Sequence, residues 1–270
     1  MIYLFDGTFE GLLTCVFTSF ENKERPTGVI PERSIQKSFT EEYIHIPTEL
    51  DKYDRVFSAM RKKSPQALHT VYNAYLADSI PGKDTTVFGC ICLFFEHGTK
   101  IKNMLQNEHV LGVNKLYHKV YMQSCKLKGF LRFEELAGNI LYAKINPTDN
   151  ILELLASHFA DRFTNQNFII FDEVRNLYAV YNTRRWIITE LEPSELPQRT
   201  EDEEQIQKMW KRFIEIIAIK ERTNPKLQRQ LMPKKYWENM FEFKEVPHAQ
   251  LSENHGVCTG SQDGRHFLQP

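Results

Sequence analysis

The sequence predicts an α+β fold, in which an antiparallel sheet of hairpins has helices packed mainly on one side and follows a helical N-terminal half. Three observations favour this class. Residues 48–128 repeat apolar side chains at helical spacing over most of their length. Residues 129–145 and 167–191 alternate around short turns, which is typical of β-hairpins. Because these strands come in hairpins and do not alternate singly with helices, we expect an antiparallel sheet.

The N-terminal segment is expected to begin with a short buried strand over residues 2–6 and to continue as a helix over residues 7–22. Asp6 or Thr8 can cap this helix through its side-chain oxygen. The following stretch is mixed, and only the region around Tyr43 favours a strand.

Breaks divide the helical half into separate helices. Pro65 suits the first turn of one helix, and the Ile-Pro-Gly-Lys-Asp sequence at residues 80–84 interrupts the helical pattern. The last helix of this half is expected to end at Gly129, because glycine is a common helix stop. A strand that carries Arg132 is expected to begin there.

The second half is expected to form a hairpin, a helix and a second hairpin. The two turns fall near residues 137–139 and 173–176, and residues 151–163 form the helix between the hairpins. Residues 201–245 add C-terminal helices. The first of these has a strong apolar stripe, which we expect to pack on the rest of the protein.

Length and composition set the scale of the fold. The chain has 270 residues, of which 41% are hydrophobic and 26% charged, so it can bury a full core. Residues 1–245 are predicted to form one compact unit, and residues 246–270 a flexible, polar tail. The formal net charge is −1, so any nucleic-acid surface must be a local basic patch.

The cysteines and the apolar segments indicate in which compartment of the cell the protein is expected. Five scattered cysteines do not resemble a disulfide framework, and the N-terminus lacks a basic region followed by an apolar stretch. We therefore expect a cytoplasmic protein. The longest apolar run, Val87–Phe95, is too short for a membrane span, which takes about 20 residues.

No metal and no cofactor are predicted. The sequence contains no glycine-rich phosphate loop, no zinc-protease motif and no nucleophile elbow, and it lacks three closely spaced cysteines for an iron–sulfur cluster. Cys90 and Cys92 lie in the apolar run, where buried, inert thiols are expected. The histidines and the cysteine of the tail lack the short paired spacing of zinc ligands.

The segment "HFADRF" places His158 and Arg162 on the apolar side of the helix expected over residues 151–163. A buried, unpaired guanidinium is costly, so Arg162 needs a partner, and Asp172 on the following strand is the preferred one. The cation beside His158 should lower its pKa and keep it neutral. The sequence leaves open whether this network only joins helix to sheet or also binds a ligand.

Two further stretches combine basic residues with aromatic residues. "KLKGFLRF" contains Lys128 and Arg132, which either contact phosphate or form a solvated edge. The second stretch suits stacking on exposed bases, or else it anchors the C-terminal segment through its aromatic rings. Its candidate residues are Lys234, Lys235, Tyr236 and Trp237.

Five segments, "YLFDGTFEGLLTCVF", "KGFLRF", "HFADRF", "FDEVRNLYAVY" and "NPKLQRQLMPKKYW", together resemble a bacterial family described as probable DNA metabolism proteins, with a core domain of unknown function. The resemblance implies a neighbouring, DNA-repair-like radical-SAM protein as partner, and related domains are fused to uracil-DNA glycosylase. Relatives often carry an acid and a histidine where this chain has Gln123 and Cys125. The motif positions that the resemblance implies are Asp6, Lys128, Arg132, His158, Arg162, Asp172, Arg175, Lys234, Tyr236 and Trp237.

Three functions follow as expectations. The first is a DNA repair or modification accessory that binds DNA or a displaced nucleotide and works with a radical-SAM partner. The second is a stand-alone enzyme acting on a nucleobase or nucleotide, with Asp172 or Asp6 as general base and His158 as proton donor. The third is a protein-interaction scaffold without a ligand. The sequence leaves open whether the chain is itself an enzyme, and the functions without catalysis are favoured over the second one.

Overall fold

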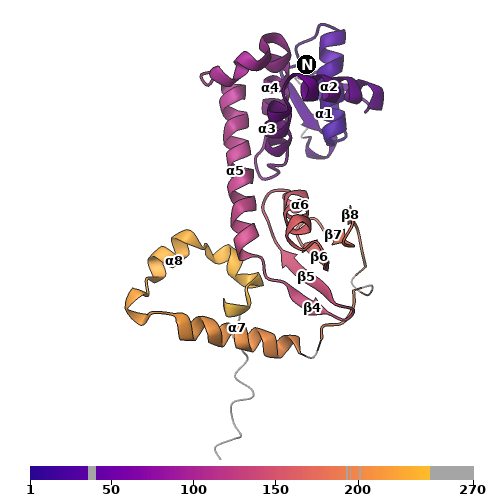
Figure 1. Cartoon of the computed structure of the whole chain (residues 1–270). Helices are drawn as coiled ribbons and strands as arrows, with labels where there is room; N and C mark the ends of the chain where they lie inside the picture. Colours follow the sequence, from indigo (N-terminus) through magenta and orange to yellow (C-terminus); the bar gives the residue numbers. More distant parts are fainter. Residues whose placement is uncertain (36–40, 193, 195, 201, 244–270) are drawn as a thin grey trace, which may run out of the picture.

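The fold is α+β, with a helical N-terminal half and two sheets in the described part of the chain (Figure 1). The structure is a computed structural model that describes residues 1–35, 41–192, 194, 196–200 and 202–243. The predicted tail over residues 246–270 lies outside these residues. No helix in the described ranges is both long and apolar enough to cross a membrane.

The N-terminus forms a small sheet whose three strands are all parallel, in the order β2-β1-β3. The strand at residues 2–6 and its helix are confirmed, and Thr8 caps the helix by accepting a hydrogen bond from the Gly11 amide at 3.0 Å. The parallel pairing was not predicted, because its edge strands are short and have no clear alternation. The elements are β1 (Ile2–Phe5), α1 (Phe9–Glu21), β2 (Gly28–Pro31) and β3 (Tyr43–His45).

Four helices follow this sheet: α2 (Leu50–Lys63), α3 (Pro65–Tyr75), α4 (Lys83–His97) and α5 (Glu108–Phe130). Pro65 opens α3, and the Ser64 hydroxyl accepts from the Ala67 amide at 3.2 Å. Helix α4 is largely buried, and burial raises the pKa of the Cys90 thiol to about 12 and that of Cys92 to about 11. The prediction of buried, inert thiols is confirmed.

Helix α5 is 23 residues long and runs from the N-terminal helices down to the second sheet (Figure 1). The prediction that a strand begins at Gly129 is wrong. The helix continues through this glycine to Phe130, and the Leu131 amide still donates to the Leu127 carbonyl at 2.9 Å. Glycine at the end of a helix costs it only about 1 kcal/mol relative to alanine, so packing elsewhere overrides the signal. Arg132 therefore lies in a connection and not in a strand.

The second sheet has the order β4-β5-β6-β7-β8 and is mostly antiparallel. Both predicted turns are confirmed, with Gly138, Asn139 and Asn176 in left-handed backbone conformations. Helix α6 (Leu152–Arg162) connects β5 to β6 and brings the chain back to the edge of the sheet where β5 begins. The two strands therefore pair in parallel where the two hairpins meet. The strands are β4 (Glu134–Leu136), β5 (Ile140–Ile145), β6 (Asn167–Asp172), β7 (Leu177–Tyr181) and β8 (Trp186–Thr189).

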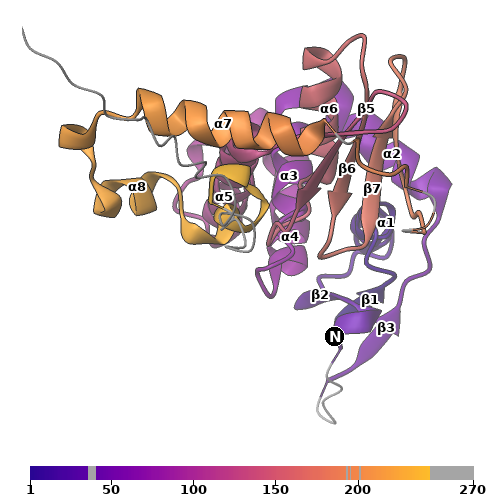
Figure 2. The ribbon, with the colours of Figure 1, turned by 90° about the horizontal axis from the view of Figure 1, so that it is seen from below.

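The C-terminal helices α7 (Glu203–Ile217) and α8 (Pro225–Leu231) form an arm that extends from the body (Figures 1 and 2). The expectation that the apolar stripe of α7 packs on the rest of the protein is wrong for the described residues. Met209 and Ile216 are each 71% exposed, and Phe213 is 51% exposed. The helical period was therefore read correctly, but an amphipathic pattern does not specify which surface covers the apolar face.

Candidate functional site

Aromatic packing brings two of the sequence motifs together. Phe133 of "KGFLRF" lies with its ring centroid 5.0 Å from that of Phe159 and 5.2 Å from that of Phe163, both in "HFADRF". All three rings contact the main core. The end of α5 is thereby fixed against the end of α6, and three polar side chains of the two motifs, Lys128, His158 and Arg162, lie beside this packing.

These polar side chains form a basic cluster, which we define as Lys128, His158 and Arg162. Lys128 is in the last turn of α5, and Arg162 is the last residue of α6. Lys128 and His158 are half-buried, whereas Arg162 is exposed. Burial, followed by the charges of Lys128 and Arg162, lowers the pKa of His158. The predicted direction is confirmed, although burial contributes more than the neighbouring cations.

The two permanent charges of the basic cluster have no partner among the described residues. Neither Lys128 nor Arg162 has a hydrogen bond or an ion pair there, and the nearby Asp161 acts only as a counter-charge that raises the pKa of His158. The carbonyl ends of two helices favour cations at these positions, which explains why the cluster is tolerated. Two unpaired cations beside a neutral imidazole are suited to an anionic ligand.

The predicted pairing of Arg162 with Asp172 is wrong. Arg162 points into solvent, whereas Asp172 is fully buried and pairs with Arg175. The geometry of the connection explains the error: β6 starts near the end of α6 and carries Asp172 at its far end. Six residues of strand span roughly 17 Å, which a single arginine side chain does not bridge.

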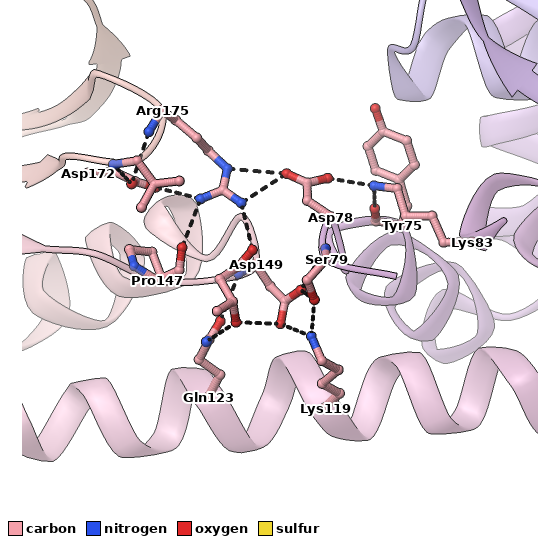
Figure 3. Close-up of polar contacts among 12 residues, drawn as sticks. Tyr75, Asp78, Ser79, Lys83, Lys119, Gln123, Pro147, Asp149, Asp172 and Arg175 are labelled. Atoms are coloured by element: carbon pink, nitrogen blue, oxygen red, sulfur yellow. Dashed lines mark hydrogen bonds and ion pairs between the residues drawn. The ribbon is translucent and has the colours of Figure 1, made fainter. Parts of the chain in front are cut away.

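Arg175 has all five of its N–H groups engaged (Figure 3). Its guanidinium donates to Asp172 at 3.1 Å, to Asp78 at 3.1 and 3.2 Å, and to the carbonyls of Pro147 and Thr148 at 3.3 and 3.2 Å. Burial raises the pKa of Asp172, and the charge of Arg175 opposes this rise. Arg175 therefore joins the turn after β6 to the loop after α3, and it has no donor left for phosphate.

Asp149 continues this network towards α5 (Figure 3). It is 1% exposed, accepts from the Ser79 hydroxyl at 2.6 Å and pairs with Lys119. Burial alone would raise the pKa of Asp149, but the hydrogen bonds from Lys119 and Ser79 outweigh it and hold the pKa below its usual value. Gln123 supports the loop by accepting from the Asp149 amide at 3.1 Å and donating to the Thr148 hydroxyl at 2.7 Å.

Among the other basic candidates, Arg132 is occupied by protein partners. The Arg132 guanidinium pairs with Glu242 at 2.7 Å and donates to the Gly129 and Leu131 carbonyls at 3.1 and 3.2 Å. Its side chain is only 20% exposed. Its charge is therefore neutralised within the protein.

The aromatic pair of the C-terminal stretch anchors the chain. Tyr236 is buried against Phe130, and the Trp237 ring stacks on Phe243 with centroids 4.3 Å apart. Lys234 and Lys235 remain exposed beside these two rings. Of the two readings left open by the sequence, the anchoring one agrees with this geometry.

Asp6 is a local organiser of the first turn. Its carboxylate accepts from the Thr8 amide at 2.9 Å, the Thr8 hydroxyl at 2.7 Å and the Thr48 hydroxyl at 2.8 Å. Burial would raise its pKa, but these hydrogen bonds hold it below its usual value. Asp6, Asp172 and His158 thus belong to three separate groups of contacts.

The sequence reasoning missed the polar residues of the loop after α3. Asp78 and Lys83 pair at 2.6 Å, and both join the network of Arg175. Lys83 belongs to the Ile-Pro-Gly-Lys-Asp sequence, which we interpreted only as a helix break, and Asp78 lies just before it. In the described residues, no three histidine, cysteine, aspartate or glutamate side chains are grouped closely enough to hold a metal ion.

The fold and the site together define an α+β protein with a surface cluster of basic groups whose two permanent charges are unpaired among the described residues. A family model described as a domain of unknown function, DUF4130, matches residues 81–242. The match covers more than half of the chain, so the protein belongs to this family. It includes the basic cluster and the five-stranded sheet, whereas the parallel N-terminal sheet precedes it. No curated protein matches the chain.

Proposed function

We propose that the protein is a DNA-metabolism accessory that holds the phosphate backbone of DNA, or of a displaced nucleotide, at the basic cluster. The observation that carries this proposal is the pair of cations, Lys128 and Arg162, that has no protein partner in the described residues. Such cations gain more from a phosphate than paired ones, because no existing salt bridge has to be broken. The aromatic packing beneath them holds both helix ends in place.

Because the basic cluster is small, we expect it to bind the phosphate backbone of DNA and not to recognise individual bases. Phosphate contacts position a protein on DNA, and the release of counterions makes them dependent on salt. The lowered pKa of His158 leaves it neutral near pH 7, so it can donate or accept a hydrogen bond without adding charge. We therefore assign two charge contacts to the cluster, and not three.

We further propose that a radical-SAM protein carries out the chemistry on the DNA. The support is the resemblance of the five sequence segments to the DNA metabolism family. Copurification of the two proteins, with and without damaged DNA, tests this part separately. If the proteins do not associate under either condition, the accessory role fails while DNA binding by the cluster stands.

The enzyme alternative needs Asp6, His158 and Asp172 around one substrate. Asp172 is fully buried behind Arg175, and Asp6 is held by Thr8 and Thr48. The charged neighbours of His158 are Lys128, Arg162 and Asp161, and they include neither Asp6 nor Asp172. Because these side chains lie in separate groups, we do not propose acid–base catalysis by them.

The test is DNA binding measured by fluorescence anisotropy across a salt series, on single-stranded and duplex oligonucleotides. Replacing Lys128 and Arg162 by alanine is expected to weaken binding about uniformly over different sequences. For duplex DNA, the slope of log affinity against log salt should fall by about 1.8, since each lost contact contributes about 0.9.

The matched control is the double alanine variant of Lys115 and Arg184. Both are exposed basic residues of the same types, outside the basic cluster. This control is expected to bind as the wild type does. Equal affinities and equal salt slopes for the cluster variant and the wild type would refute the proposal and favour the scaffold reading.

A further inference from the structure

A second candidate site lies at the carboxyl edge of the N-terminal parallel sheet. A cleft of about 730 Å³ opens there, between the ends of β1 and β2, the first turn of α4 and the turn after β6. Gly7 and Arg33 line it from the sheet side, Lys83 and Asp84 from α4, and Arg175 from the turn. Ligands of α/β sheets bind outside the carboxyl ends of parallel strands, where the connections diverge to either side. Here β2 and β3 lie on opposite sides of β1, so the cleft occupies that position.

Asp84 is an unsatisfied acceptor in the wall of this cleft. The residue is 6% exposed, yet its Oδ1 atom has no hydrogen-bond partner among the described residues. Burial raises the pKa of its carboxyl group, and the adjacent charge of Lys83 opposes this rise. Lys83 does not satisfy it, because the ammonium group donates to Asp78 at 2.6 Å and to the Tyr75 carbonyl. Buried polar atoms are almost always paired, so this oxygen indicates a missing donor.

Arg33 is a cation that lines the same cleft from the sheet side, and its charge, like that of Lys83, opposes the rise in the pKa of Asp84. Its side chain has no hydrogen bond or ion pair within the part of the chain that the structure describes. The backbone of Gly7 has φ +87°, and a Cβ atom there would lie 3.4 Å from the Pro31 Cβ and 3.6 Å from the Arg33 Nε. These distances are ordinary van der Waals contacts, so glycine is needed here for its positive φ, and the Arg33 side chain lies beside the turn after β1.

The N-terminus of α4 adds a second element that favours an anion. Helix α4 is 15 residues long, and its N-cap, Gly82, has no side chain to satisfy the amides of the first turn. Gly82 and Thr85 line the cleft together with Lys83 and Asp84. The positive end of the helix and the free guanidinium thus lie on the same cleft, as in many phosphate sites.

We propose that this cleft binds a mononucleotide, with its phosphate on Arg33 at the start of α4 and an N–H donor of its base on Asp84 Oδ1. The ligand must carry both an anion and a hydrogen-bond donor, because the described residues of the cleft present a cation and a buried acceptor that have no protein partner among them. Ile30, Ile80 and Pro81 give the cleft apolar lining suited to a base. The volume lies within the range of about 300–1,000 Å³ found for sites of small organic ligands, which is more than inorganic phosphate or an amino acid fills.

This inference does not depend on the basic cluster. The cleft shares no residue with Lys128, His158 and Arg162. Replacing Lys128 and Arg162 by alanine is therefore expected to leave nucleotide binding unchanged. Failure of backbone binding at the cluster and failure of nucleotide binding in the cleft can be told apart with the same variants.

Isothermal titration calorimetry on the full chain tests the proposal. The probes are the four nucleoside monophosphates and their nucleosides, with inorganic phosphate and glycine as small-anion and amino-acid controls. D84N keeps the shape of the side chain. It is expected to lower the affinity for nucleotides and for nucleosides by about tenfold, the loss typical of a hydrogen bond to a charged group. R33Q should lower the affinity for nucleotides by about tenfold and leave the affinity for nucleosides unchanged.

The matched control for R33Q is R184Q, which alters an exposed arginine outside the cleft and should bind as the wild type does. R33Q should keep the wild-type Tm, since Arg33 is exposed. The proposal is overturned if no nucleotide binds at about millimolar concentration. It is equally overturned if D84N and R33Q bind nucleotides as the wild type does, or if phosphate or glycine alone binds as tightly.

Discussion

Arg175 and Arg162 both belong to the sequence motifs, yet they have opposite surroundings. Arg175 is 14% exposed and gives every N–H group to a protein acceptor. Arg162 is exposed and gives none within the described residues. A guanidinium whose donors are all used supports the architecture, whereas one whose donors are all free is available to a ligand. The role of a motif arginine must therefore be assigned from its partners and not from its presence in the motif.

Replacing Arg175 by alanine should produce the largest effect on stability. The change leaves Asp172 buried without its cation and cuts the link to Asp78, so we expect a loss of about 3–5 kcal/mol in the free energy of unfolding. Urea denaturation measures this loss. Replacing the exposed Arg184 by alanine is the control and should change stability by about 0.5 kcal/mol or less. A loss of less than about 1 kcal/mol for the Arg175 variant would contradict the architectural role.

Acidification should weaken the same network at Asp149, with a smaller effect. Its pKa in the folded protein is held below the value of the unfolded chain, so its ionised form contributes to stability. This contribution is complete above about pH 4, the ordinary pKa of aspartate, and is lost as the pH falls through the folded pKa. Replacing Asp149 by asparagine should therefore cost about 1–3 kcal/mol at pH 7 and less near pH 3. Urea denaturation at both pH values provides the measurement, and an equal loss at both would contradict this account.

The sequence predicted local structure better than it predicted the partners of charged groups. The turns at Gly138–Asn139 and after Asp172 were recognisable because glycine and asparagine permit the left-handed backbone that tight hairpins need. The parallel pairing of β2 with β1 was not recognisable, because a strand of four residues is too short for its hydrophobic pattern to indicate which strand it pairs with. Local pattern therefore defined most of the elements but only part of the sheet topology.

The candidate site shows the same limit. The sequence grouped His158 with Arg162 correctly, since both lie on one helix, and it singled out Lys128. It paired Arg162 with the wrong carboxylate, because the position of Asp172 depends on the direction in which β6 leaves α6. Asp84 and Arg33 were missed entirely, since their proximity arises only when the ends of β2 and α4 meet across the cleft. Side chains far apart in sequence carry no local signal of their contact.

Replacing Arg162 by alanine should produce the smallest effect on stability, and this variant tests the comparison most directly. The side chain has no partner to lose among the described residues, and its favourable position at the end of α6 is worth about 0.3–1 kcal/mol. We expect a loss of about 0.5 kcal/mol in urea denaturation, close to that of the Arg184 variant and far from that of the Arg175 variant. DNA affinity measured on the same preparation should nevertheless fall, because a phosphate contact is removed. If the Arg162 variant instead lost about 3 kcal/mol or more, as expected for a buried pair, the two arginines would have the same role and the basic cluster would be architectural.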